Sequence, residues 1–146
     1  MAASWLGTDG STLNVGTGGT VRKVLIRGGT WDGGNCVVLV PSSVVSNPTI
    51  IFDGVTIRNF TNVLVALSAC TVVFRNCDLD TISFVVKGQT NAINVRVVDG
   101  GGNKFTSAPL AQMLNSSTLT IYGQELPVTL STTGVQATVR GQFCTS

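Results

Sequence analysis

The sequence predicts an all-β protein, a right-handed parallel β-helix of about six coils. Two observations lead to this fold class. A three-residue motif, an apolar residue followed by a charged or aromatic residue and then Gly or Asn, occurs six times, and a short β-branched run precedes each occurrence. The motifs are Ile26-Arg27-Gly28, Phe52-Asp53-Gly54, Phe74-Arg75-Asn76, Val98-Asp99-Gly100, Ile121-Tyr122-Gly123 and Val139-Arg140-Gly141. They lie 26, 22, 24, 23 and 18 residues apart, which is a spacing typical of stacked coils.

Each motif is expected to form a corner, because Gly and Asn tolerate positive φ. The strands that lead into the corners are predicted at residues 24–26, 49–52, 71–74, 95–98, 119–121 and 137–139. A second apolar anchor follows the first by five residues at Trp31, Ile57, Leu79 and Leu126, and is displaced at Phe105 and Phe143. A third apolar run follows in several coils, which predicts three short strands per coil between residues 21 and 143.

The chain is expected to have two regions. Residues 1–20 are rich in Gly, Ser and Thr and are predicted to form an N-terminal arm or cap, and residues 21–146 are predicted to form the β-helix domain. A β-helix leaves unpaired strand edges at its ends. Trp5 and Leu6 of the arm are therefore expected either to cover the first coil of the same chain or to dock on another protein.

Alternation along the strands predicts which side chains face outwards. If the apolar residue before each corner faces inwards, the residue two positions earlier does so too, and it is apolar in every coil except at Arg96. A bulge or a strained turn beside Gly100 to Gly102, or a buried and paired arginine, would explain that exception.

The outward position between these two residues is aliphatic in four consecutive coils. It is occupied by Leu25, Ile51, Val73 and Val97. A contiguous exposed aliphatic stripe indicates a partner surface. Either a loop or the N-terminal segment of the same chain covers it, or identical chains pack this face around a symmetry axis, which is the interpretation we prefer.

Charged residues alternate in sign beside the aliphatic positions. The first row contains Arg27, Asp53, Arg75 and Asp99, and a second row contains Asp32, Arg58 and Asp80. Exposed pairs of this kind contribute about 0–1 kcal/mol each, so the rows are expected to select the register of the coils. Carboxylates two coils apart are separated much as in an inverting glycosidase. The intervening arginines favour the ionised form, however, whereas a general acid must hold a proton, so we expect no catalytic residues.

Composition narrows the function classes further. The chain has 146 residues, of which 43% are hydrophobic and 11% are charged, with a net charge of +2, as expected for one domain with a core. It has no basic stripe with interleaved aromatic residues, so no nucleic acid is expected as a partner. No apolar segment reaches the roughly 18 residues of a membrane span, so we expect no contact with a membrane. We also expect no cofactor. The N-terminus has no basic region followed by an apolar one, so we expect no secretory signal.

The four cysteines are not expected to bind a metal. Cys36, Cys70, Cys77 and Cys144 have no CxxC spacing, and the chain contains no histidine. They are predicted to be small buried hydrophobic residues. A disulfide that forms in an oxidising medium is the alternative.

In this coil pattern the chain resembles the pectate-lyase-like right-handed β-helix superfamily, which includes polysaccharide lyases, polygalacturonases and the trimeric tailspikes of bacteriophages. The resemblance covers the coils only, and no catalytic motif of the family matches. A small β-helix without an enzyme groove is similar to virion components. The resemblance implies a capsid decoration (cement) protein of a bacteriophage, synthesised in the host cytoplasm. It also implies a homotrimer that contacts the major capsid protein or another virion protein. A tail-spike or receptor-binding module for surface glycans is the alternative, and a glycan-cleaving enzyme is less favoured.

Overall fold

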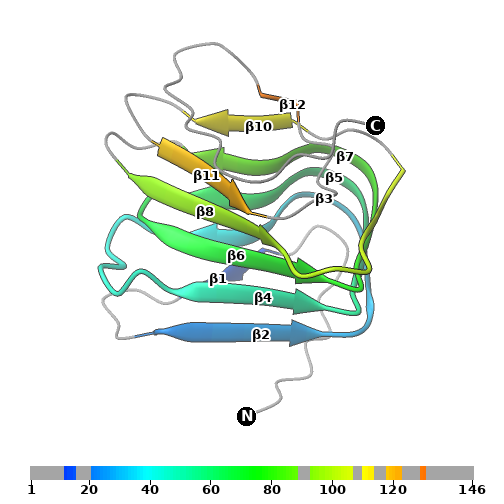
Figure 1. Cartoon of the computed structure of the whole chain (residues 1–146), viewed down its shortest axis with the longest axis horizontal. Coiled ribbons are helices and arrows are strands. Elements are labelled where there is room, and N and C mark those ends of the chain that lie inside the picture. Colours follow the sequence, from blue (N-terminus) through cyan, green and yellow to red (C-terminus); the bar gives the residue numbers. More distant parts are fainter. Residues whose placement is uncertain are drawn as a thin grey trace.

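The protein is a parallel β-solenoid. The computed structural model describes residues 12–15, 21–88, 93–106, 110–113, 118–122 and 129–130. In this part of the chain about four turns stack on one another, and their strands form two sheets in which neighbouring strands are parallel (Figure 1). The predicted all-β parallel fold is therefore confirmed, with fewer turns than the six expected. The last expected repeat, at residues 137–139, lies outside the described residues.

Each turn contributes strands to both sheets. The smaller sheet contains β2 (Lys23–Arg27), β4 (Thr49–Asp53), β6 (Cys70–Arg75), β8 (Asn94–Asp99) and β11 (Thr118–Tyr122). The larger sheet contains β1 (Leu13–Asn14), β3 (Thr30–Val40), β5 (Thr56–Ala66), β7 (Asp78–Gly88), β9 (Lys104–Phe105), β10 (Leu110–Met113) and β12 (Thr129–Leu130). Successive turns therefore lie side by side in both sheets.

Two of the three short strands expected per coil are joined in the structure. The second and third apolar runs form one bent strand of 11 residues in β3, β5 and β7. The second anchors stack as expected, because Trp31, Ile57, Leu79 and Phe105 pair in register from turn to turn. The displaced anchor Phe105 therefore keeps its place in the stack.

The predicted left-handed corners are present in the first three turns. Gly28, Gly54 and Asn76 have φ values of 64°, 65° and 52°. Each corner is tied to the next turn, since the Gly28 amide donates to the Asp53 carbonyl at 2.9 Å and the Gly54 amide donates to the Arg75 carbonyl at 3.0 Å. The corners expected at residues 123 and 141 lie outside the described residues.

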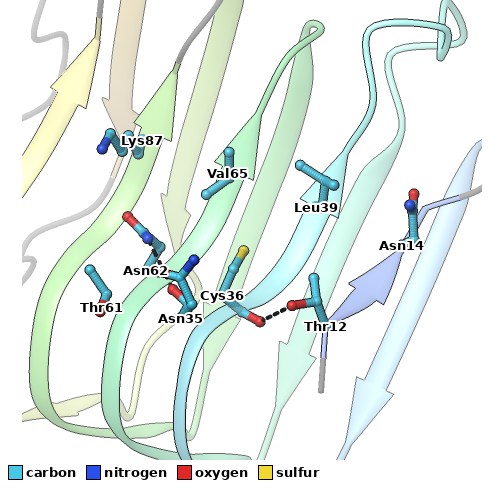
Figure 2. A pocket seen from close by; sticks show the side chains of 9 residues that line it. All are labelled: Thr12, Asn14, Asn35, Cys36, Leu39, Thr61, Asn62, Val65 and Lys87. Carbon is cyan, nitrogen blue, oxygen red and sulfur yellow. Dashed lines mark hydrogen bonds between the residues drawn. The ribbon is translucent and has the colours of Figure 1, made fainter. Parts of the chain in front are cut away.

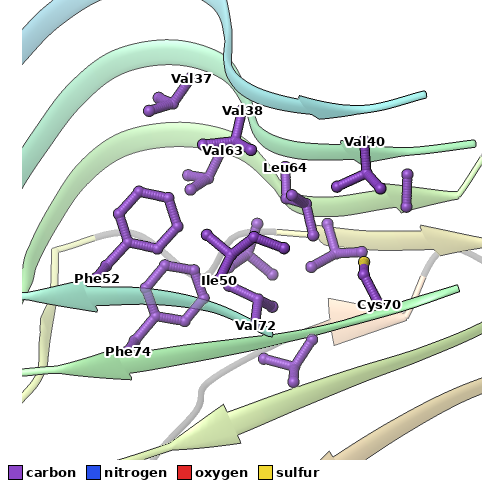
Figure 3. Close-up of a cluster of buried hydrophobic side chains, with 14 of the residues drawn as sticks. Val37, Val38, Val40, Ile50, Phe52, Val63, Leu64, Cys70, Val72 and Phe74 are labelled. Atoms are coloured by element: carbon purple, nitrogen blue, oxygen red, sulfur yellow. The ribbon is translucent and has the colours of Figure 1, made fainter. Parts of the chain in front are cut away.

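The core is a column of aliphatic and aromatic side chains between the two sheets (Figure 3). Phe52 and Phe74 are fully buried on adjacent strands, and their rings stack with centroids 5.1 Å apart and planes 9° apart. Cys36, Cys70 and Cys77 are buried free thiols, as expected, whereas Cys144 lies outside the described residues.

The register of β8 differs from the prediction by one residue. Asp99, not Val98, pairs with Phe74, and Val95 and Val97 are the buried residues of this strand. The expectation that Val97 faces outwards was therefore wrong, and Val98 takes its place on the outer face.

The glycine-rich corner after β8 accounts for this shift. Positive φ occurs at Gly101 and Gly102, so the left-handed turn comes later than the motif predicted. Arg96 is exposed on the outer face, which overturns the explanation by a buried, paired arginine.

Part of the expected N-terminal arm belongs to the solenoid. Leu13 pairs with Val38 in the larger sheet, and Val15 is 3% exposed and packs in the core. Trp5 and Leu6, the predicted docking residues, lie outside the described residues.

Candidate functional site

The outer face of the smaller sheet carries a continuous aliphatic column. We call this column the outer stripe, and it consists of Leu25, Ile51, Val73 and Val98. These residues pair in register across β2, β4, β6 and β8, and Tyr122 of β11 extends the column beside Val98. Leu25 is 40% exposed and Tyr122 is 43% exposed, while the other three are partly exposed. Three of the four predicted stripe residues thus lie side by side. The one-residue shift of β8 puts Val98 in the fourth position in place of Val97.

A row of ion pairs runs beside the outer stripe. The Asp53 carboxylate lies between two guanidinium groups, with Oδ2 3.3 Å from Nη2 of Arg27 and 3.4 Å from Nη2 of Arg75. We call these three residues the charge ladder. The predicted alternation of sign down the coils therefore produces real contacts across β2, β4 and β6.

Asp99 does not join the ladder, contrary to the prediction. The shifted register of β8 pairs Asp99 with Phe74, so Gly100 lies beside Arg75. The two backbones are close, since a Cβ atom added to Gly100 would be 3.0 Å from the Cβ of Arg75. The Asp99 carboxylate instead accepts hydrogen bonds from the Gly101 amide at 2.9 Å and from Nδ2 of Asn103 at 2.6 Å. Its role is to fix the glycine-rich corner.

The outer face of the smaller sheet has a positive net charge. Lys23 and Arg96 are exposed on the side of the stripe opposite the ladder. Together with Arg27 and Arg75 they make four cations, and Asp53 is the one acidic side chain on the described part of this face. Long cationic side chains therefore border the aliphatic column on both sides.

The second row of charges is also partly formed. Arg58 Nε lies 2.8 Å from Oδ2 of Asp32, and Nδ2 of Asn59 donates to Oδ1 of the same carboxylate at 2.7 Å. The hydrogen bond from Asn59 is the main cause that holds the pKa of Asp32 below its ordinary value, and Arg58 acts in the same direction. Asp80 pairs in register with Arg58 and accepts a hydrogen bond from the Thr81 hydroxyl at 3.2 Å.

A pocket on the outer side of the larger sheet was not predicted from the sequence (Figure 2). Its volume is about 420 Å³, and it is lined by Thr12, Asn14, Asn35, Cys36, Leu39, Thr61, Asn62, Val65 and Lys87. These side chains come from β3, β5, β7 and the residues around β1, so stacking of the turns creates the pocket. The sequence signal that could have indicated the pocket is Asn62, a polar residue directly before the apolar run at residues 63–67.

Asn62 is the distinctive polar group of this pocket. It is 5% exposed, and its Nδ2 donates to the Asn35 carbonyl at 2.9 Å, while its Oδ1 has no hydrogen-bond partner in the described structure. A buried acceptor without a partner carries a free-energy cost that a donor from a ligand or a water molecule would remove. Lys87 adds a cation, whose Nζ lies 5.5 Å from the centroid of the Phe84 ring.

Cys36 contributes an apolar surface to the pocket. Burial raises the pKa of its thiol to about 11, so the thiol is neutral at physiological pH. A nucleophilic cysteine must be a thiolate. The structure therefore gives no support to a nucleophilic role for Cys36.

The described residues contain no group of three or more Cys, Asp or Glu side chains placed to hold a metal ion. None of the segments that the structure describes is a helix of sufficient length and apolar character to cross a membrane.

No family model, curated protein or solved structure matches the chain significantly. The assignment of function therefore depends on the faces and pockets of the solenoid itself.

Proposed function

We propose that the protein is a structural component that self-associates through the outer face of its smaller sheet. The observation that carries this proposal is the outer stripe, whose aliphatic residues lie in register on the outer face of the smaller sheet, with Leu25 and the adjoining Tyr122 substantially exposed. Contiguous apolar surface of this kind is typical of a protein interface, whereas single exposed aliphatic residues are ordinary.

The charges around the stripe favour a ring over a two-fold dimer. A two-fold contact sets the same patch of both subunits against itself, which would bring the cations Lys23, Arg27, Arg75 and Arg96 of the two chains together. A heterologous contact places this face against a different surface of the neighbour, and it forms a ring when the rotation between neighbours closes. The charge distribution thus favours a heterologous ring, and the homotrimer is the ring that we propose.

The finer proposal is a capsid decoration protein of a bacteriophage virion, which contacts the major capsid protein or another virion protein. Its support is the coil pattern, which resembles small virion β-helices, together with an outer face suited to lateral packing. In this proposal the protein is synthesised in the host cytoplasm and acts in the virion, without a cofactor.

The geometry of the carboxylates supports a function without catalysis. Asp53 is ion-paired on two sides, and the hydrogen bond from Asn59 and the ion pair with Arg58 hold the pKa of Asp32 below its ordinary value. A glycosidase needs one carboxylic acid that retains its proton near neutral pH. The lowered pKa of Asp32 favours the opposite protonation state.

Light scattering on a double variant tests the self-association. Leu25→Asp together with Val73→Asp places two carboxylates in the outer stripe, and we expect the variant to have the mass of a monomer. Val45→Asp is the matched control, because Val45 is 85% exposed and lies outside the smaller sheet. An unchanged mass for the double variant would refute the proposed interface.

Co-sedimentation with empty bacteriophage capsids tests the finer proposal. We expect the wild-type protein to sediment with capsids of its own phage and the double variant to remain largely in the supernatant. Equal sedimentation of both proteins would show that the outer stripe does not mediate attachment, and no sedimentation of either would refute the decoration role.

The pocket supports a second candidate, a module that recognises surface glycans. Its rim carries amide and hydroxyl groups, and the unpartnered Oδ1 of Asn62 is suited to accept a hydrogen bond from a sugar hydroxyl. A glycan array tests this alternative. Binding that Lys87→Gln weakens and Lys104→Gln leaves unchanged would support it, and a blank array would count against it.

A further inference from the structure

β2 is an edge strand among the strands that the structure describes. It lies at the end of the smaller sheet, and β4 is its neighbour among the described strands (Figure 1). The Arg22 carbonyl accepts from the Thr49 amide and the Gly28 amide donates to the Asp53 carbonyl, both at 2.9 Å. In a parallel ladder the hydrogen-bonding direction alternates along the strand.

The alternation shows which backbone groups of β2 have no partner strand in the described part of the chain. Even-numbered residues direct their amides and carbonyls towards β4, so Lys23, Leu25 and Arg27 direct theirs away from it. An edge with this pattern is a template for an additional strand.

The core is also incompletely covered at this end. Val24 and Ile26 face inwards but are half-buried, whereas their partners in β4, Ile50 and Phe52, are fully buried. A further strand on β2 would place another apolar layer against Val24 and Ile26. Backbone pairing and apolar burial therefore favour the same addition.

The charge ladder specifies the chemistry of that strand. Arg27 and Arg75 both lie against Asp53, so the ladder alternates in sign from turn to turn. An acidic residue is the one that continues this alternation beyond Arg27. A second copy of β2 does not provide an acidic residue. Antiparallel pairing would set Lys23 against Arg27, and parallel pairing would set Arg27 against Arg27 of the other copy. Like charges opposite one another are destabilising.

We propose that the β2 edge binds an extended segment of a partner protein as an additional parallel strand. The segment has alternating apolar residues that cover Val24 and Ile26, followed by an acidic residue beside Arg27. β4 shows the required pattern, Thr49 to Asp53, on the opposite side of β2. This inference does not require self-association through the outer stripe, because it uses the backbone of β2, the core side chains Val24 and Ile26, and Arg27.

Fluorescence anisotropy with a labelled peptide tests the proposal. The probe has the sequence Thr-Ile-Ile-Phe-Asp-Gly, as in residues 49–54, and the control peptide has lysine in place of aspartate. We expect saturable binding of the probe to the full-length protein and at least tenfold weaker binding of the control peptide. No saturable binding of the probe below about 1 mM would overturn the proposal.

Leu25→Pro separates edge pairing from other contacts. Proline removes an amide that points away from β4, so the β2–β4 ladder is retained, as is usual for proline on an edge strand. We expect this variant to keep the far-ultraviolet circular dichroism of the wild type and to lose peptide binding at least tenfold. Undiminished binding to a folded Leu25→Pro variant would contradict strand addition.

Charge exchange at Arg27 tests the acidic position and provides a second route if the proline variant does not fold. Arg27→Glu is expected to reverse the preference, so that the lysine peptide binds more tightly than the aspartate peptide. Arg96→Glu is the matched control, since Arg96 lies on the same outer face but away from the edge, and Val73→Asp controls for the outer stripe. A preference that Arg27→Glu leaves unchanged would refute the assignment.

Discussion

Truncation of Phe74 is expected to remove a large part of the stability of the solenoid. Phe74 is fully buried, and its ring stacks on Phe52 of the preceding turn with centroids 5.1 Å apart. A buried Phe→Ala substitution costs about 3–5 kcal/mol, of which the loss of an aromatic pair accounts for about 0.5–1.5 kcal/mol. The total stability of a domain is about 5–15 kcal/mol, so Phe74→Ala removes a substantial share of it.

Urea unfolding followed by circular dichroism measures this loss. With a slope of about 2 kcal/mol per M, a loss of about 4 kcal/mol lowers the midpoint by about 2 M. Val45→Ala is the control, because Val45 is 85% exposed and its truncation should change stability by less than about 0.5 kcal/mol. A double-mutant cycle with Phe52→Leu and Phe74→Leu isolates the coupling of the rings. A loss below about 1 kcal/mol for Phe74→Ala would refute the stacked core.

Three further predictions test the register of β8, a strained backbone position in β7 and the buried thiols. Val97→Asp should cost at least about 3 kcal/mol because Val97 is 1% exposed, whereas Val98→Asp should cost less than about 1 kcal/mol; similar urea midpoints would contradict the register of β8. Thr81 has a φ of 52°, which a β-branched residue tolerates poorly, so Thr81→Asn should raise the melting temperature by about 2–4 °C, and a decrease would argue against strain there. Burial raises the thiol pKa of Cys36 from 9.0 to about 11 and that of Cys70 from 9.0 to about 12. Between pH 9.0 and pH 11–12 these thiols lose their protons on unfolding, so the free energy of unfolding should fall as the pH rises through that range. A variant with alanine at both positions should show a smaller fall.

The repeat and its alternation were sufficient to predict most of the solenoid. The corners at Gly28, Gly54 and Asn76, the buried pair Phe52 and Phe74, and the stack of second anchors all follow from local composition and a period of two along the strands. These features could be predicted because each residue type has a direct physical cause, positive φ for the corners and apolar burial for the anchors.

The register of β8 could not be predicted from the motif alone. Val98-Asp99-Gly100 has the same residue classes as the motif in the earlier turns, yet the turn it precedes contains two further glycines with positive φ. Because side chains alternate with a period of two, a slip of one residue exchanges the inner and outer faces. Arg96 was the signal of the slip, since the observed register exposes it and buries Val95 and Val97.

The sequence by itself determined the fold class, most of the core and three residues each of the outer stripe and the charge ladder, because these depend on residue type, on alternation along a strand and on the length of the repeat. Only the tertiary structure decided the fourth residue of the outer stripe, the pocket around Asn62 and the edge at β2. Each of these depends on which residues of different turns lie side by side, and that is set by hydrogen bonding between turns that are 22–26 residues apart.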